Sequence, residues 1–260
     1  MVKGLEVFRE RFRQHEGSFV LIGGAACHEW FAAEGLEFRP TKDLDIVLIV
    51  EVLDPSFVAA IRAFVSDGGY EIRRRTSDQP ILYRFAKPTA DQFPAQLEFF
   101  SRRPDGRLLH SDQDIIPIAS GMERHSLSAI LLEDDYYALI QDHQTSRDGL
   151  PVVTAAALIP LKACAWLNLS SLKAQGEHID SREMNKHRND VFALASTLPG
   201  TPGPQLPPSI LADLSRFIGE FSETSPEWTA IRSSLKHTFS SDLQPSTLLG
   251  AIQTYYRMSP

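Results

Sequence analysis

The stretch Leu21 to Val50, LIGGAACHEWFAAEGLEFRPTKDLDIVLIV, carries the strongest fold signal in the chain. The apolar run at residues 18–22 ends at Gly23 and Gly24. This pattern predicts a buried strand followed by a sharp change of direction. Residues 25–34 have the composition of a helix, and residues 43–50 are rich in β-branched side chains, which predicts a second buried strand. A strand, a helix and a strand in close succession indicate an α/β arrangement.

The rest of the first half continues this alternation. Asp54 and the proline after it form a cap and first-turn pair for a helix over residues 55–64. Strand-like runs follow at residues 70–75, 81–86 and 95–101. We therefore predict an α/β (α+β) domain over residues 1–150, with helices packed against a mixed sheet.

From about residue 154 the periodicity becomes helical and stays so. Residues 199–208, PGTPGPQLPP, hold five of the 17 prolines and predict a semi-rigid linker. Amphipathic helices are predicted on either side of it, at residues 181–198, 209–221, 227–239 and 247–256. The second half is therefore predicted to be a helical domain over residues 151–260.

Composition and charge exclude several classes of protein. A formal net charge of −7 over 260 residues argues against a protein that coats nucleic acid through its overall field. Cys27 and Cys164 have neither C-x-x-C nor Cys/His spacing, which removes a disulfide framework and a structural zinc site. The longest apolar stretch, residues 151–169, is interrupted by Pro160 and Lys162. We expect a cytoplasmic protein without a membrane partner.

Three carboxylates are candidates for chemistry. Asp43 and Asp45 are separated by one residue at the start of a predicted strand, so both project from the same face. Such a pair suits one or two Mg²⁺ or Mn²⁺ ions. Glu98, in QLEFF, would be a third ligand and a general base if its strand lies beside theirs. Two metal ions held in this way activate an attacking hydroxyl and stabilise a leaving pyrophosphate, which is the chemistry of nucleotidyl transfer.

The residues around these carboxylates are candidates for nucleotide binding. Gly23 and Gly24 would let the backbone approach a phosphate at the start of a helix, where free N–H groups point outward. Thr41 lies two residues before Asp43, where its hydroxyl would contact phosphate, become a site of self-modification or, more ordinarily, cap a turn. Arg39 would either bind phosphate or cover the edge of the sheet.

The helical half supplies candidate cations. Lys162 lies in the apolar segment LIPLKACAWLNL, so it must extend outward to solvent or meet an anion. Arg182, Lys186 and Asp190 recur at four-residue intervals on one helix face. A triphosphate bound in a cleft between the two halves would meet Lys162 and Lys186, with Asp190 orienting a lysine or contacting the nucleoside.

These residues carry a family resemblance. The G-G-A motif, R-x-T-K-D-L-D at residues 39–45, the lone Lys162 and K-H-R-N-D at residues 186–190 resemble the nucleotidyltransferase fold in its AbiEii-like branch of abortive-infection toxins. The resemblance covers residues 19–195. In that branch a metal-binding D-x-D follows a glycine pair, and a pattern K-x6-R-x4-K-D-x2-D follows downstream. The D-x-D is matched here, and Lys162, Lys186 and Asp190 match parts of the second pattern.

The resemblance implies transfer of a nucleoside monophosphate from an NTP to an acceptor hydroxyl, on RNA such as tRNA or on protein. It also implies a toxin with a cognate antitoxin as partner. Two positions depart from the pattern, because Leu169 stands in place of the arginine and His187 in place of the aspartate after Lys186. These departures keep a second function open, namely a catalytically inactive protein that binds a nucleotide or a partner on the same fold.

Overall fold

The computed structural model describes residues 2–52, 55–74, 80–102, 115–118, 127–236, 238–239 and 243–258. The predicted cap Asp54 and the predicted strand residue Arg75 lie outside these residues. The chain divides into two compact units. We call them the sheet unit, Met1–Glu29 with Pro40–Val153, and the helical unit, Trp30–Arg39 with Thr154–Pro260.

The sheet unit alternates helices and strands, which confirms the predicted α/β class of the first half. Its elements in chain order are α1 (Leu5–Phe12), the 3-10 turn η1 (Arg13–His15), β1 (Phe19–Ile22), the start of α2 (Gly23–Ala33), β2 (Asp43–Leu48), α3 (Pro55–Gly68), β3 (Glu71–Arg74), β4 (Pro80–Ala86), β5 (Gln96–Ser101), β6 (Ile115–Ile118), β7 (Leu127–Leu131), α4 (Asp134–Asp142), β8 (Gln144–Arg147) and β9 (Leu150–Val153).

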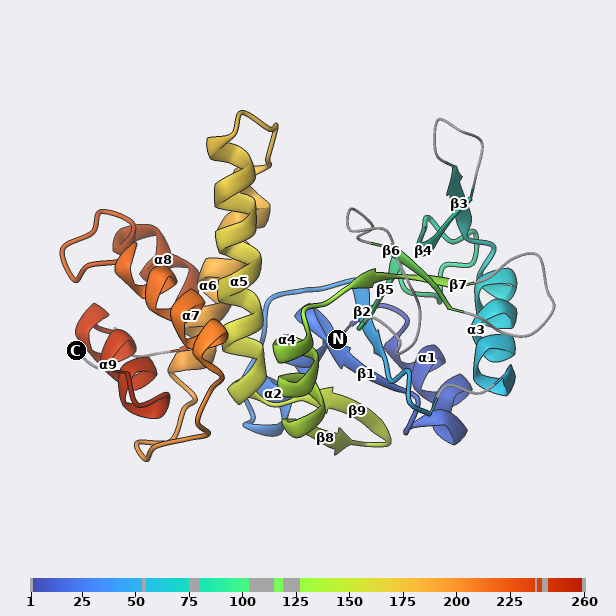
Figure 1. Ribbon diagram of the computed structural model, residues 1–260, viewed down its shortest axis with the longest axis horizontal. Coiled ribbons are helices and arrows are strands. Elements are labelled where there is room, and N and C mark those ends of the chain that lie inside the picture. Colours follow the sequence, from blue (N-terminus) through green and yellow to red (C-terminus); the bar gives the residue numbers. More distant parts are fainter. Residues whose placement is uncertain are drawn as a thin grey trace. The chain divides into compact units, whose positions relative to one another are not determined.

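The strands form the predicted mixed sheet, whose order is β3-β4-β5-β2-β1-β9-β8, with β7 paired to β5 and β6 (Figure 1). β2 runs antiparallel to β1 and parallel to β5, so it lies between two apolar strands. The hairpin of β8 and β9 turns at Asp148 and Gly149, whose φ angles are 48° and 78°. An Asp-Gly pair favours this turn, so the hairpin has a local sequence signal that our prediction missed.

The core of the sheet unit is aromatic where α1 and α3 meet β1. Phe8 of α1 lies 5.3 Å from Phe19 and 5.6 Å from Phe64 between ring centroids, and Phe12 lies 5.8 Å from Phe57. Every residue of β1 is buried. Because apolar burial and edge-to-face ring contacts are both favourable, this cluster fixes the strand that leads into the Gly23–Gly24 turn.

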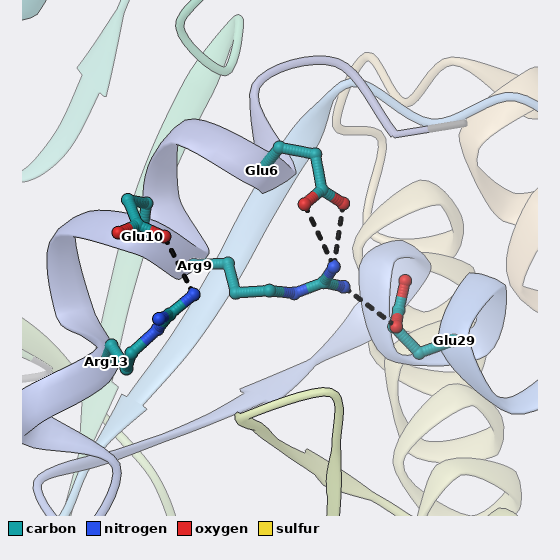
Figure 2. A network of polar contacts seen from close by, with 5 residues as sticks. All are labelled: Glu6, Arg9, Glu10, Arg13 and Glu29. Carbon is teal, nitrogen blue, oxygen red and sulfur yellow. Dashed lines mark hydrogen bonds and ion pairs between the residues drawn. The ribbon is translucent and has the colours of Figure 1, made fainter.

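An ion-pair network ties α1 to α2. Arg9 lies between Glu6 and Glu29, and Figure 2 shows its guanidinium reaching both carboxylates. The distances from Arg9 nitrogens are 2.8 Å to Glu6 Oε1 and 3.2 Å to Glu29 Oε2. Burial raises the pKa of Glu29, and the positive charge of Arg9 opposes that rise. The contact therefore helps keep a half-buried carboxylate ionised beside α1.

The helical unit consists of the segment at residues 30–39 and the C-terminal helices (Figure 1). These are α5 (Ala155–Ala174), α6 (Ser181–Ala195), α7 (Pro208–Gly219), α8 (Trp228–Leu235) and α9 (Pro245–Tyr255). Phe192 lies at the centre of an aromatic cluster, 4.7 Å from Trp228, 5.5 Å from Phe221 and 5.8 Å from Phe217 between ring centroids. Among the described residues, α5 is the one helix long and apolar enough to cross a membrane by length and composition, and 56% of its most apolar stretch is buried.

Residues 30–39 belong to the helical unit although they lie within the predicted α/β domain. Trp30 Nε1 donates a hydrogen bond to Thr197 Oγ1 at 3.1 Å. Phe31 stacks on Phe38 at 5.2 Å and meets Phe239 at 6.2 Å between ring centroids. These contacts bind the segment to a helical core far away in sequence, which no local pattern in residues 30–39 indicates.

The predicted linker at residues 199–208 is held against α9. Gly203 N donates to Tyr255 O at 2.8 Å, and Arg257 Nη2 donates to Gly203 O at 3.2 Å. A Cβ atom at Gly203 would lie 2.3 Å from the Tyr255 ring, so the segment approaches that ring closely. Leu206 is buried. The proline-rich segment is thus packed within the helical unit.

Candidate functional site

The sheet unit presents the predicted carboxylates on one face of β2. Asp43 and Asp45 are half-buried, whereas Leu44 and Ile46 between and after them are fully buried. The alternation follows from the two-residue period of a strand. Asp45 is in register with Glu98 on the neighbouring parallel strand β5. We call Asp43, Asp45 and Glu98 the acidic face.

Glu98 has a partner that the sequence did not reveal. Arg84 of β4 stands opposite Glu98 in the antiparallel pairing of β4 with β5. Its Nε donates to Glu98 Oε1 at 3.0 Å, and its Nη2 donates to the same oxygen. Glu98 is 8% exposed, so this ion pair compensates the charge of a buried carboxylate. Arg84 has no sequence signal, because its position depends on the register of two strands.

The donor set fits a hard divalent cation in part. Asp43 and Asp45 supply carboxylate oxygens on one face, which is the ligand chemistry that Mg²⁺ and Mn²⁺ take. Within the part of the chain that the structure describes, no group of three His, Cys, Asp or Glu side chains is arranged to hold a metal ion. Glu98 is instead engaged by Arg84. Asp43 and Asp45 thus supply the kind of oxygen ligand that such an ion takes, and Glu98 would join them only after leaving Arg84; metal binding by these residues stays a prediction.

The glycine pair brings the start of α2 against this face. α2 begins directly after β1, with Gly23 at φ 65°. A Cβ atom at Gly23 would lie 1.8 Å from Asp45 Oδ2, and one at Gly24 would lie 2.6 Å from Thr41 Oγ1. The backbone at the helix start thus contacts both the Asp45 carboxylate and the Thr41 hydroxyl. The first N–H groups of a helix have no partner within it, so the Asp45 carboxylate lies beside a helix start, where a negative charge is favoured.

The helical unit holds a polar triad of Arg39, Lys162 and Asp190, in which the lysine and the aspartate are buried and the arginine is half-buried. Arg39 Nε donates to Asp190 Oδ1 at 2.8 Å and its Nη2 donates to Oδ2 at 2.7 Å. Lys162 Nζ donates to Oδ2 at 2.8 Å. Lys162 is 4% exposed and Asp190 2%. The anion that the buried lysine meets is therefore an aspartate of the same unit.

The charges of the triad hold Asp190 ionised. Burial alone raises the pKa of Asp190, but the positive charge of Lys162 and the hydrogen bonds from Arg39 outweigh burial and keep the pKa below its ordinary value. A bidentate Arg–carboxylate contact is both strong and directional. The Asp190 carboxylate is thus compensated by two cations.

Lys186 stands apart from the triad. It lies on the exposed side of α6 and donates to Glu183 Oε1, three residues earlier in the same helix. Its side chain is 47% exposed. The predicted helix face of Arg182, Lys186 and Asp190 therefore combines two exposed cations with a buried carboxylate. Binding of a triphosphate by Lys162 and Lys186 stays a prediction.

His187, one of the two departures from the family pattern, lies beside the triad. Burial lowers its pKa, and the charge of Lys162 lowers it further, to about 4. Its Nδ1 is buried and has no hydrogen-bond partner among the described residues. The positive charges of Arg39 and Lys162 would repel a third cation at this position, so they favour a neutral imidazole.

The lowered pKa of His187 makes stability depend on pH. In the folded protein His187 stays neutral down to about pH 4, while in the unfolded chain it takes up a proton below its ordinary pKa of 6.5. The unfolded state binds more protons in this window, so the stability of the helical unit falls as pH falls from 6.5 to 4. We expect this residue to contribute about 2–3 kcal/mol of that loss.

Urea denaturation at several pH values tests this, with tryptophan fluorescence as the readout because all three tryptophans, Trp30, Trp166 and Trp228, lie in the helical unit. His187→Gln should give a flatter pH profile than the wild type. His143→Gln, which changes a histidine of α4's C-terminal cap in the sheet unit, is the control and should leave the profile unchanged. Parallel profiles for His187→Gln and the wild type would show that His187 does not titrate as described.

Comparison with known proteins finds likeness in structure. No protein-family profile matches the chain, and no curated protein does. Among solved structures, the chain is similar to an antigenic nucleotidyltransferase-like protein from Paracoccidioides brasiliensis, with 15% sequence identity and a TM-score of 0.47 over 92% of this chain and 95% of that one. The description of that protein does not mention the AbiEii-like branch. At this identity and TM-score, the activity of this chain depends on its own residues for evidence.

Proposed function

We propose that the protein is a Mg²⁺-dependent nucleotidyltransferase that moves a nucleoside monophosphate from an NTP to an acceptor hydroxyl on RNA or protein. The observation that carries the proposal is the contact of the Gly23 backbone with the Asp45 carboxylate. It brings a carboxylate, the kind of group that Mg²⁺ takes as a ligand, beside the N-terminus of α2. Nucleotidyl transfer needs these two features next to each other, because the phosphates carry the metal ion and must be held by N–H donors.

Each predicted site residue of the sheet unit has a role in this proposal. Asp43 and Asp45 would hold Mg²⁺ or Mn²⁺, and the ion would supply charge neutralisation on the phosphates and activation of the acceptor hydroxyl. The N–H groups after Gly23 and Gly24 would orient the phosphates, and a hydroxyl at Thr41 would add one more donor. Glu98 would accept the proton of the acceptor hydroxyl or become a third ligand. In such reactions positioning and charge neutralisation supply most of the rate enhancement.

The transfer assay tests the proposal directly. The protein is incubated with each of four α-labelled NTPs, Mg²⁺ or Mn²⁺, and total RNA or total cell protein, and label in the macromolecular fraction is measured. Asp45→Asn should lower transfer at least about 100-fold, because the amide keeps the shape of the side chain but loses the charge that binds the ion. Asp91→Asn, which changes an exposed aspartate of the same unit, should transfer like the wild type. If Asp45→Asn transfers nucleotide as well as the wild type does, Asp45 is not a metal ligand of the reaction.

The toxin role and the cognate antitoxin belong to the same proposal, on the strength of the sequence resemblance. Expression of the wild-type chain should then slow growth, and Asp45→Asn should relieve it. Growth inhibition that persists in this variant would separate toxicity from transfer.

Two observations favour a second candidate function, binding without turnover. Glu98 is tied to Arg84, and the described residues hold no three-ligand metal group. An inactive protein would bind an NTP, measurable by calorimetry, yet give no labelled product with any of the four nucleotides or either acceptor pool. Labelled product that requires Asp45 would exclude this candidate.

A further inference from the structure

A row of three charged residues crosses neighbouring strands of the sheet unit. Arg84 of β4 is in register with Glu98 of β5, and Glu98 is in register with Asp45 of β2. Side chains in register on adjacent strands share a face of the sheet, so Glu98 stands between a cation and an aspartate. It has two competing neighbours, the Arg84 guanidinium and any cation bound at Asp45.

The two members of the ion pair differ in freedom to move. The side chain of Arg84 is 37% exposed and that of Glu98 is 11% exposed. Arg84 binds Glu98 through two nitrogens on one oxygen, Oε1. A long, partly solvated arginine can exchange a carboxylate for a phosphate, because the guanidinium binds both in the same geometry. Glu98 has little room to exchange its partner for water.

We propose that Arg84 is a latch on Glu98. It holds the carboxylate out of the metal site until a polyphosphate anion takes its place on the guanidinium, and Glu98 then turns to the cation held by Asp43 and Asp45. This inference rests on the proposed function. It explains why Glu98 lies in register with Asp45 yet pairs with an arginine. Arg84 is a positioning residue in this account, since it acts on the metal through Glu98.

Binding of Mn²⁺ to the full-length protein without nucleotide tests the latch, with the EPR signal of the free ion as the readout. Arg84→Gln should bind Mn²⁺ about tenfold more tightly than the wild type, because releasing a charge-assisted pair frees a third ligand. Arg84→Gln/Glu98→Gln should return to the wild-type affinity. Glu98→Gln alone should stay within about twofold of the wild type, since a latched Glu98 contributes no ligand.

Lys42→Gln is the matched charge control. Lys42 is exposed and adjacent to Asp43, so its loss changes the net charge near the acidic face by the same amount. Under the latch, Lys42→Gln stays within about twofold of the wild type. Equal gains in Arg84→Gln and Lys42→Gln would show a general field effect and overturn the latch. A loss of affinity in Glu98→Gln would do the same, because Glu98 would already be a ligand.

The latch and the proposed function can fail separately. If the wild type binds Mn²⁺ and transfers nucleotide while Arg84→Gln gains no affinity, the latch is wrong and the transferase stands. If Arg84→Gln gains affinity and no labelled product forms with any NTP, the latch stands and the transferase is wrong. In an active enzyme, Arg84→Gln should also raise the KM for NTP about tenfold. An unchanged KM would contradict the proposal that Arg84 exchanges the Glu98 carboxylate for a phosphate of the nucleotide.

Discussion

Asp190→Ala is expected to destabilise the helical unit by about 3–5 kcal/mol, because it leaves the buried Lys162 ammonium without its counter-charge. Lys162 is 4% exposed, so water cannot replace the lost carboxylate without local opening of the unit. Arg39 is less affected, since its side chain is 32% exposed. Urea denaturation followed by tryptophan fluorescence measures the change in the free energy of unfolding, and all three tryptophans lie in this unit.

Two further variants separate charge from packing. Lys186→Ala breaks an exposed ion pair on the same helix, and we expect a change within about 0.5 kcal/mol. Asp190→Leu combined with Lys162→Met removes both buried charges and should recover most of the loss, because apolar replacement of a buried ion pair is often neutral. An Asp190→Ala protein within about 1 kcal/mol of the wild type would contradict the coupling of the triad.

Gly23→Ala is expected to destabilise the sheet unit by about 3 kcal/mol, from two separate sources. A residue with a Cβ atom adopts the φ angle of 65° only at a cost in conformational free energy. The new Cβ would also lie 1.8 Å from Asp45 Oδ2, so the carboxylate or the start of α2 must move. Denaturation followed by far-UV circular dichroism measures the loss, and transfer should fall with it because Asp45 is displaced.

Gly17→Ala is the matched control, since a Cβ at Gly17 meets nothing within 4 Å and its φ angle is not positive. It should change stability by no more than about 0.5 kcal/mol. Adding Asp45→Ala to Gly23→Ala removes the contact with Oδ2 but not the backbone strain, so it should recover only part of the loss. Gly23→Ala with the stability of Gly17→Ala would show that the glycine is not required by the site.

The acidic face divides clearly into a part that was predictable and a part that was not. Asp43 and Asp45 share a face because strand side chains alternate, a rule that needs only the sequence around them. Glu98 required a condition, namely that its strand lies beside theirs, and the parallel pairing of β2 with β5 meets it. The partner of Glu98 was unpredictable, because Arg84 reaches it through the register of a third strand.

The helical unit shows the same division. The apolar segment around Lys162 predicted a lysine that either extends outward to solvent or meets an anion, and the structure shows the second of these. Its partner Asp190 comes from another helix, and Arg39 comes from a segment that local pattern assigned to the α/β domain. Lys186 and Asp190 lie four residues apart, yet only Asp190 joins the triad.

By itself, the sequence determined strands β1 to β5, helices α2 and α3, the helical character of the second half, the shared face of Asp43 and Asp45, and the need for glycine between the first strand and its helix, because each depends on a period or a backbone angle within a few residues. Only the tertiary structure decided which charges meet, Glu98 with Arg84 and Lys162 with Asp190 and Arg39. The physical reason is that an ion pair depends on the position of both partners to within an ångström or so. That position is set by strand register and helix packing between residues far apart in the chain.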